Sequence, residues 1–283
     1  MAHLILQAPR LVAADVERLA AVACADGVQE LKPTAIRLLN VDESTRDEVL
    51  AMAQAAHLDA AWLTSVHRLA ECKVLAMDMD STLVNIECID EIADAVGRKA
   101  EVAAITEASM RGEIKDFSES LRRRVALLRG VPETALEQVF SQRLRLNPGA
   151  ENLIETMRSH GVKTILVSGG FTFFTRRLQR GLLLDESHGN VLEVVDGKLT
   201  GHVLGDIVDG AAKARHVQAL AQSLGASPEQ LIVMGDGSND LPMMALAHYS
   251  VAYRAKPVVR AQARFALDVS PLDAVLNWFR LQH

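Results

Sequence analysis

Short apolar runs alternate with amphipathic stretches along the chain from about residue 73 onward. The runs at 74–78, 162–170, 231–237 and 250–253 (VLAMD, VKTILVSGG, LIVMGDG and SVAY) are apolar until they reach small or polar residues. Continuous apolar strands that alternate with helices are typical of a parallel sheet covered on both faces. The pattern therefore predicts an α/β fold with a doubly wound parallel sheet, whose ligands bind at the carboxyl ends of its strands.

One of the helices between these strands has clear sequence limits. Leu153 and Met157 are four residues apart and would share one buried face. Asn147 is placed to cap the N-terminus of this helix, with Pro148 in its first turn and Gly161 at its end. We therefore predict a helix that begins directly after Asn147.

Residues from about 86 to 145 break the alternation, because they read as consecutive helices with no strand between them. Ile89, Ile92, Ala93 and Val96 recur at helical spacing. Since the segment follows the first strand directly, we expect a helical insertion that lies over the end of that strand as a cap or lid. The predicted helices cover 86–97, 99–112, 116–130 and 132–144.

Residues 1–72 form a unit of their own, ahead of a larger domain at 73–283. Two stretches read as strands and two as helices, and together they predict a small α+β module. The module contains no cluster of chemically reactive side chains. Its predicted strands cover 3–9 and 35–41, and its predicted helices cover 13–25 and 46–58.

Composition and charge narrow the choice of function. Of the 283 residues, 49% are hydrophobic, and the formal net charge of −6 argues against a broad nucleic-acid surface, which needs a basic face. No apolar stretch approaches the roughly 20 residues of a membrane-spanning helix, and no secretion signal is recognisable at the start. Cys24, Cys72 and Cys88 include no C-x-x-C pair, which fits reduced thiols. We expect a cytoplasmic protein that binds neither nucleic acid nor membranes.

Asp78 and Asp80 follow the first strand of the predicted sheet and are two residues apart, so both can approach the same ligand. Neighbouring carboxylates repel each other, and a divalent cation such as Mg²⁺ relieves that repulsion. Asp78 could then stay ionised and attack phosphorus, while Asp80 could give a proton to the leaving oxygen and later take one from water. An ordinary turn after a strand would explain the pair equally well.

Three other segments offer partners for such chemistry. In VSGGF, Ser168 and the two glycines after it would let backbone N–H groups approach phosphate oxygens. Lys213 lies near the start of a predicted helix, where its ammonium group could hold a phosphate. GDGSND places Asp236, Asn239 and Asp240 within five positions, which suits metal and phosphate binding. Taken singly, two turns and a solvated lysine would also account for these residues.

In combination and order, these segments resemble the haloacid dehalogenase superfamily of phosphotransferases. The motifs of that superfamily are an aspartate pair, a Ser or Thr, a Lys and a final acidic cluster. Longer segments are similar to the phosphoserine phosphatase family within it, and the resemblance covers about 73 to 270, cap included. It implies a Rossmann-like core. The similar segments are DMDSTLVNIECIDEIA, ITEASMRG, SLRRRVALL, LVSGGFTFFT, DGKLTG, GDGSNDLPMM and AKPVV.

The resemblance implies a role for each motif residue. Asp78 would be the nucleophile that forms an aspartyl-phosphate, and Asp80 would be the general acid and base. Mg²⁺ would be held by Asp78, the backbone carbonyl of Asp80, and Asp236, with Asp240 supporting the metal or Lys213. The residues that would bind the phosphoryl group or the substrate are Ser168, the Gly169 amide, Lys213 and Asn239.

The cap would decide the substrate, because phosphoserine carries an ammonium and a carboxylate besides its phosphate. By the resemblance, Glu87 would bind the amino group and Arg124 the carboxylate. Arg122, Arg123 and Arg124 are consecutive, and at 100° per residue on a helix they cannot all point inward. At least one of them therefore belongs to a solvated helix face.

Met110 and Phe117 are similar to the apolar wall that closes over the substrate in this family and excludes water. Packing in a core would also explain both. The stretch between them, RGEIKD, is one residue longer than the spacing usual in the family, which leaves the placement of Phe117 open.

Taken together, the resemblance implies Mg²⁺-dependent hydrolysis of O-phospho-L-serine to L-serine and phosphate, the final step of L-serine biosynthesis. The same residues could instead pass the phosphoryl group to another alcohol, such as homoserine. Residues 1–72 resemble a degenerate ACT-like regulatory module or a dimerisation unit, so a homodimer is one expectation and a purely structural role is another. A serine sensor without useful turnover is a third interpretation, against which the complete set of catalytic positions argues.

Overall fold

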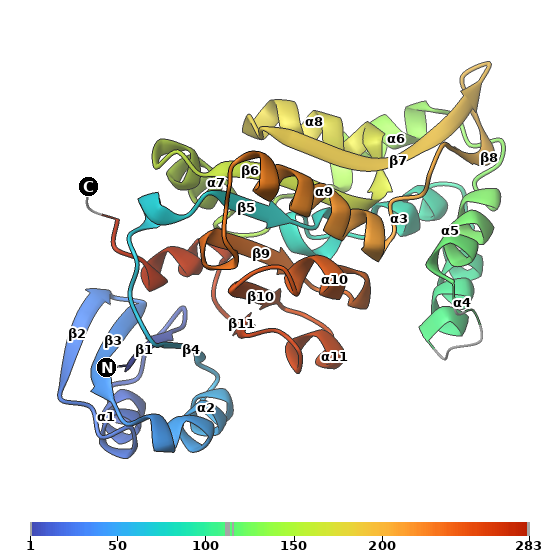
Figure 1. Cartoon of the computed structure of the whole chain (residues 1–283). Coiled ribbons are helices and arrows are strands. Elements are labelled where there is room, and N and C mark those ends of the chain that lie inside the picture. Colours follow the sequence, from blue (N-terminus) through green and yellow to red (C-terminus); the bar gives the residue numbers. More distant parts are fainter. Residues whose placement is uncertain (1, 111–113, 115, 282–283) are drawn as a thin grey trace.

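The computed structural model describes residues 2–110, 114 and 116–281, with side chains outside positions 109 and 110. Figure 1 shows a small N-terminal module and a larger α/β domain. The four-stranded sheet of the module and the seven-stranded sheet of the domain are separate. In the part of the chain that is described, no helix is long and apolar enough to cross a membrane.

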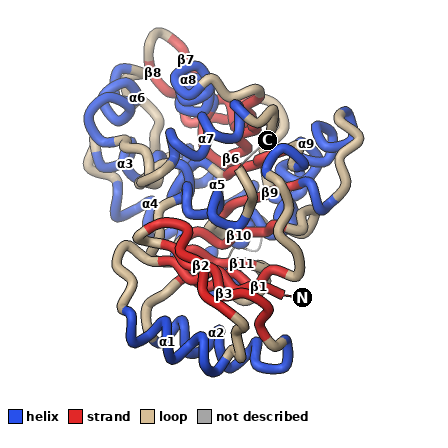
Figure 2. The backbone as a smooth tube through the Cα atoms, turned by 90° about the vertical axis from the view of Figure 1, so that its left-hand side faces the viewer, coloured by secondary structure: helices blue, strands red, loops and turns tan. Residues whose placement is uncertain are grey.

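The N-terminal module is an antiparallel sheet of order β2-β3-β1-β4 with two helices. The predicted α+β module is confirmed, and β2 and β4 are additional to the two strands that the sequence predicts. Leu4 and Leu6 of its first strand pack with Leu19 of the first helix, whereas Ile5 between them joins the core of the larger domain. Strand β1 therefore buries side chains on both of its faces. Figure 2 shows the sheet between the helices α1 and α2 and the larger domain. The elements are β1 (Ala2–Gln7), α1 (Ala13–Val22), β2 (Gly27–Lys32), β3 (Ala35–Val41), α2 (Arg46–Ala55) and β4 (Asp59–Leu63).

The larger domain is built on a seven-stranded sheet of order β11-β10-β9-β5-β6-β7-β8. The pairs from β11 to β7 are parallel, and β8 runs antiparallel to β7. Its elements are β5 (Val74–Met77), α3 (Cys88–Asp94), α4 (Lys99–Met110), α5 (Phe117–Ala126), α6 (Thr134–Gln138), α7 (Ala150–Ser159), β6 (Lys163–Phe171), α8 (Thr172–Leu182), β7 (Glu186–Val195), β8 (Lys198–Leu204), α9 (Gly210–Ser223), β9 (Leu231–Gly235), α10 (Leu241–Met244), β10 (Tyr249–Tyr253), α11 (Pro257–Arg260) and β11 (Phe265–Leu267).

The central strand β5 is buried on both faces, which explains its unbroken apolar sequence. Leu75 and Met77 pack with α7 and α8 on one face, and Val74 and Ala76 pack with α9 and α10 on the other. Because β6 lies on one side of β5 and β9 on the other, the chain winds in both directions from this strand. The predicted doubly wound α/β fold is confirmed, and the carboxyl end of β5 is the switch point where such folds bind ligands.

Helices α3 to α6 form the cap, which follows β5 as predicted and gathers beyond one end of the sheet (Figure 1). The sequence analysis did not predict the β7–β8 hairpin on which this cap rests. Leu199 of the hairpin accepts a hydrogen bond from the N–H of Gly130 (2.8 Å) and donates one to the carbonyl of Val131 (2.8 Å). The Glu133 N–H donates to the carbonyl of Gly197 (2.9 Å). Backbone hydrogen bonds therefore attach the end of the cap to the edge of the sheet.

The predicted cap at Asn147 is wrong, because α7 begins at Ala150 after Gly149, whose φ is +82°. The buried Asn147 side chain instead donates to the carbonyls of Thr82 (2.8 Å) and Val84 (3.1 Å). These carbonyls belong to the turn after β5 and would otherwise lack partners inside the protein. Asn147 thus fixes the segment that carries Asp80.

A buried carboxylate joins the N-terminal module to the larger domain. Asp59 begins β4 and is 4% exposed. It accepts hydrogen bonds from three consecutive backbone N–H groups after β11, those of Asp268 (2.7 Å), Val269 (3.2 Å) and Ser270 (2.7 Å). These are charge-assisted bonds in a buried place, so they are among the strong ones.

We predict that Asp59→Ala lowers the free energy of unfolding by about 3 kcal/mol, because it leaves several buried N–H groups without an acceptor. Urea denaturation followed by circular dichroism measures the change. Asp206→Ala, which removes an exposed carboxylate after β8, is the matched control and is expected to unfold like the unsubstituted protein. Equal unfolding midpoints for both variants would contradict the role given to Asp59.

Candidate active site

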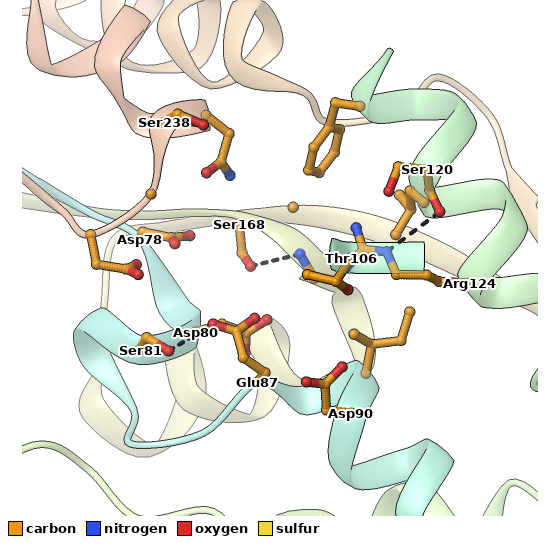
Figure 3. Close-up of a pocket in the computed structure, with 18 of the residues that line it drawn as sticks. Asp78, Asp80, Ser81, Glu87, Asp90, Thr106, Ser120, Arg124, Ser168 and Ser238 are labelled. Atoms are coloured by element: carbon orange, nitrogen blue, oxygen red, sulfur yellow. Dashed lines mark hydrogen bonds between the residues drawn. The ribbon is translucent and has the colours of Figure 1, made fainter. Parts of the chain in front are cut away.

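A cavity of about 440 Å³ lies at the carboxyl ends of β5, β6 and β9, between the core and the cap (Figure 3). Its lining is unusually rich in charged and polar side chains. The core contributes Asp78, Asp80, Ser81, Ser168, Gly169, Gly170, Phe171, Asp236, Gly237, Ser238, Asn239 and Lys256. The cap segment contributes Glu87, Ile89, Asp90, Thr106, Phe117, Ser120, Leu121 and Arg124.

The floor of the cavity is a buried ion cluster of Asp78, Lys213 and Asp240. The Lys213 ammonium, 0% exposed, donates to Asp78 Oδ1 at 2.6 Å and to Asp240 Oδ1 at 2.7 Å. Burial alone would lower the pKa of Lys213, but Asp240 and Asp78 outweigh it and hold that pKa above its ordinary value. The predicted phosphate-binding lysine therefore lies beneath the cavity rather than on its surface, where it neutralises two carboxylates.

Asp240 organises the loop after β9. Its second oxygen, Oδ2, accepts hydrogen bonds from the N–H groups of Asp236 (3.1 Å) and Gly237 (3.0 Å). The loop passes so close to this carboxylate that a Cβ on Gly235 would meet Asp240 Oδ2 at 2.5 Å. Because one oxygen of Asp240 binds Lys213 and the other binds the loop, this carboxylate holds Lys213 and Asp236 in position.

Asp78 and Asp236 are the carboxylates best placed to hold a cation. One carboxylate oxygen from each of Asp78, Asp236 and Asp240 lies within 4.8 Å of the others. Burial, and next the charge of Asp240, raise the pKa of Asp236 to about 7, and the same two causes raise the pKa of Asp78. Both oxygens of Asp240 already accept hydrogen bonds. The donor set of hard oxygens and the unrelieved repulsion fit a divalent cation such as Mg²⁺.

Asp80 lies in the irregular turn after β5, where Ser81 adopts a φ of +57°. Its Oδ1 accepts a hydrogen bond from the N–H of Cys88 (3.3 Å). Burial, followed by the charge of Glu87, raises the pKa of Asp80 to about 7. A carboxyl group with this pKa can both give and take a proton near neutral pH, as a general acid and base must.

The end of β6 brings backbone and hydroxyl groups to the same cavity. Ser168 Oγ accepts a hydrogen bond from the Gly170 N–H (2.8 Å), and the Gly169 carbonyl accepts one from the buried Asn190 side chain (2.8 Å). A Cβ on Gly170 would lie 3.0 Å from Asp80 Oδ2. Small residues are therefore required here because the motif loops approach each other closely.

The cap side of the cavity carries the predicted recognition residues (Figure 3). Arg124 is half-buried and its Nε donates to the Ser120 carbonyl (3.4 Å), while Glu87 accepts from the Ser81 hydroxyl (2.7 Å). Burial lowers the pKa of Arg124, and the negative charges of Asp90 and Glu87 oppose that shift. The cap side of the cavity thus offers Glu87 as a partner for an ammonium group of a ligand and Arg124 as a partner for a carboxylate.

The other two arginines of the triplet behave as the sequence predicts for a solvated helix face. Arg122 and Arg123 are exposed, and Arg123 forms an ion pair with Glu119 one turn earlier. Such exposed pairs contribute little stability. Arg124 is therefore the arginine that this helix directs into the cavity.

The apolar wall is described only in part. Phe117 lies against the end of β6, since a Cβ on Gly169 would meet its Cζ at 2.8 Å. Met110 is the last residue of α4, and its side chain lies outside the described residues. Most of the segment RGEIKD that follows it lies outside them as well. From the same helix, Thr106 lines the cavity.

Sequence reasoning missed Asp90, Lys256 and Asn190. Asp90 lies in the first turn of α3, three residues after Glu87, which directly precedes this helix, and both line the cavity. Their short spacing in the sequence is a signal that could have found Asp90. Lys256 follows β10 within the AKPVV segment and lines the cavity at the end of a parallel strand. Asn190 donates to Gly169 and accepts from the Val208 N–H (2.9 Å), and nothing in its local sequence marks it.

Two family models match the chain. Residues 75–245 match the haloacid dehalogenase-like hydrolase family. Residues 4–49, in the N-terminal module, match a domain family of unknown function. The first match covers the ends of β5, β6 and β9, and with them the motif residues that line the cavity.

Curated proteins and solved structures give the same picture. The chain is 56% identical to phosphoserine phosphatase of Polaromonas sp. strain JS666, over 74% of this chain and 91% of that protein. A haloacid dehalogenase family hydrolase from Salmonella enterica serovar Typhi superposes with a TM-score of 0.90 at 27% identity and covers 99% of both chains.

A probable phosphoserine phosphatase from Vibrio cholerae superposes with a TM-score of 0.83 at 35% identity, over 99% of this chain and 86% of that one. These likenesses extend through the cap and the Rossmann-type core, where the cavity lies. The chain belongs to the haloacid dehalogenase-like hydrolases.

Proposed function

We propose that this protein is a Mg²⁺-dependent phosphatase that hydrolyses O-phospho-L-serine to L-serine and phosphate, as the final step of L-serine biosynthesis. The observation that carries the proposal is one cavity with two chemically different walls. Asp78 and Ser168 face it from the core, while Glu87 and Arg124 face it from the cap. Relatives that share up to 56% of their residues with this chain are named phosphoserine phosphatase.

Asp78 and Asp236 would hold Mg²⁺, together with the backbone carbonyl of Asp80. Their clustered carboxylates fit this role, because a cation offsets the burial and, next to it, the charge of Asp240, which together raise their pKa values. When bound, Mg²⁺ supplies positive charge that stabilises the transferring phosphoryl group.

In the first step, a carboxylate oxygen of Asp78 attacks phosphorus in line with the bond to the seryl oxygen. That bond breaks as the aspartyl-phosphate forms, and Asp80 gives its proton to the departing seryl oxygen. The pKa of Asp80, near 7, means that the protonated form is well populated at neutral pH. L-Serine leaves with that proton.

In the second step, water attacks the phosphorus of the aspartyl-phosphate. Asp80, now ionised, takes a proton from the water, and the bond between phosphorus and the Asp78 oxygen breaks. Phosphate leaves, and both aspartates return to their starting forms. Ser168 and the Gly169 amide would hold the phosphoryl oxygens, while Lys213 keeps positive charge beside Asp78 throughout (2.6 Å).

On the cap side, Glu87 would bind the substrate ammonium and Arg124 its carboxylate, with Asn239 contacting the substrate from the core. Asp90 lies near Arg124 and adds negative charge to this wall. Phe117 and Met110 would close over the substrate and keep bulk water from the aspartyl-phosphate.

We assign residues 1–72 a structural role, since the face of their sheet that carries Ile5 packs into the core of the larger domain. A regulatory or dimer-forming role is the alternative. The cytoplasm is the compartment we infer, because Cys24, Cys72 and Cys88 are all free thiols.

Asp78→Asn is expected to reduce phosphate release from O-phospho-L-serine by at least about 1000-fold, because an amide is a poor nucleophile toward phosphorus. A phosphate assay without any added alcohol also separates hydrolysis from transfer to an alcohol acceptor. Asp206→Asn, on the surface after β8, serves as the control and is expected to keep full activity. Rapid release by the Asp78 variant would remove the nucleophile from the proposal.

Mg²⁺ is expected to raise the melting temperature, and to do so more at pH 8 than at pH 6. The pKa of Asp236 is raised to about 7 in the folded chain, so folding favours its protonated form and the metal-free protein loses stability as pH rises through 7. The cation replaces that proton and restores the lost stability. Thermal denaturation at both pH values measures the shift.

Asp236→Asn removes the carboxylate and is expected to abolish most of the Mg²⁺ effect. It is also expected to weaken the pH dependence, of which a part remains because the pKa of Asp80 is raised to about 7 as well. The Asp206→Asn protein again provides the matched control. A Mg²⁺ shift that is equal at both pH values, or unchanged in the Asp236 variant, would show that the cation binds elsewhere.

Arg124→Lys is expected to raise KM for O-phospho-L-serine about 10- to 100-fold with a smaller effect on kcat, because an ammonium group cannot form the two parallel bonds of a guanidinium with a carboxylate. Steady-state kinetics measures both constants. Arg122→Lys, two residues earlier on the exposed face of α5, is the control. Unchanged KM in the Arg124 variant would assign the substrate carboxylate to another residue.

A further inference from the structure

A second cavity, of about 290 Å³, lies between the cap and the core on the other side of Phe171. Phe171 ends β6 and lines both this cavity and the candidate active site. The first turns of α8 form one wall of the second cavity, and α6 of the cap and β7 form the others. Figure 1 shows these three elements together at the top of the molecule.

Three arginines of α8 line this cavity, and they are held in different ways. Arg177 donates to Glu137 of the cap (3.0 Å) and stacks 3.6 Å above the Phe173 ring. Arg176 and Arg180 are exposed and one turn apart, and among the described residues neither has an ion pair or a side-chain hydrogen bond. Two adjacent cations repel each other, and an anion bound between them would relieve that repulsion.

The remaining lining includes apolar side chains from the cap and from β7. Leu136 of the cap and Leu192 and Val194 of β7 face the cavity, and Val194 is 36% exposed. Glu133 is the acidic residue of the lining and limits the excess positive charge. The cavity thus combines two available guanidinium groups with an apolar surface that a hydrocarbon body would cover.

The shape of this cavity is already fixed by contacts around it. The Glu133 N–H donates to the Gly197 carbonyl (2.9 Å), which holds the start of α6 against the hairpin. The Arg177–Glu137 ion pair joins α8 to α6 from the other side. These contacts hold α6 and α8 in place before a ligand binds, so only the exposed side chains of Arg176 and Arg180 would have to be ordered by it.

We propose that this second cavity binds a small organic dianion with a short apolar body. Its two anionic groups contact Arg176 and Arg180, and its body lies against Leu136, Leu192 and Val194. The site is distinct from the phosphate-handling cavity, because the residues that bind the dianion take no part in that chemistry. Its ligand contacts the cap and the core at the same time.

Phthalate is a suitable probe, because it carries two carboxylates on one ring and no phosphorus. Isothermal titration of the full-length protein with phthalate at pH 8 is expected to give one binding site. In the double variant Arg176→Gln, Arg180→Gln the affinity is expected to fall at least about tenfold, since two charge-assisted contacts are lost. Arg10→Gln, Arg158→Gln removes the same charge from two exposed positions elsewhere and is expected to bind as the unsubstituted protein does.

Arg124→Gln distinguishes this site from the candidate active site. Phthalate that enters the second cavity binds to that variant with unchanged affinity. The proposal is overturned if phthalate fails to bind the unsubstituted protein, if the Arg176, Arg180 variant binds equally well, or if Arg124→Gln is the change that abolishes binding.

Discussion

The structure depends on keeping Asp78, Asp236 and Asp240 together in a buried place, where the buried ammonium group of Lys213 pairs with two of them. Buried carboxylates repel each other and lose their hydration, so each needs a partner. The charge of Asp240 is compensated because one of its oxygens accepts a hydrogen bond from Lys213 and the other accepts hydrogen bonds from the backbone after β9. Asp78 and Asp236 have oxygens left for other partners. Their pKa values are raised by burial and, next, by the charge of Asp240, which shows that their negative charges are not fully neutralised. The doubly wound sheet supplies the geometry, because β5 and β9 are neighbours and end at the same edge.

The β7–β8 hairpin helps to position the cap, together with the packing of the cap's own helices. Backbone bonds from Gly130, Val131 and Glu133 to the hairpin fix where α5 ends and α6 begins, and α5 carries Arg124. A Cβ at Gly201 of β8 would lie 3.2 Å from the Ala126 carbonyl, so the strand and α5 pack too closely for a larger residue. The edge of the sheet therefore determines how a recognition residue faces the catalytic side of the cavity.

The sequence predicted the parts of the molecule whose patterns are local. Buried parallel strands are continuously apolar, and the residues at their carboxyl ends meet, so β5, β6 and β9 and their motif residues were found. Strand β2 was missed because four of its six residues are exposed, so its sequence does not alternate clearly between apolar and polar residues. Asn147 was misassigned because its partners, Thr82 and Val84, are more than 60 residues away. Contacts of that kind arise from tertiary packing, and no local spacing encodes them.

Glu87 links substrate recognition to proton transfer in the proposed reaction. Its negative charge is, after burial, the main cause that raises the pKa of Asp80. A substrate ammonium that pairs with Glu87 compensates this charge and so lowers the pKa of Asp80. With a pKa of about 7, Asp80 is thus partly protonated in the free protein near neutral pH, and it would become a stronger acid once the correct substrate is bound. A phosphate ester without an amino group leaves Glu87 uncompensated and keeps Asp80 the weaker acid. In the proposed reaction the same residue would therefore favour phosphoserine in two ways, through binding and through the proton that the leaving oxygen needs.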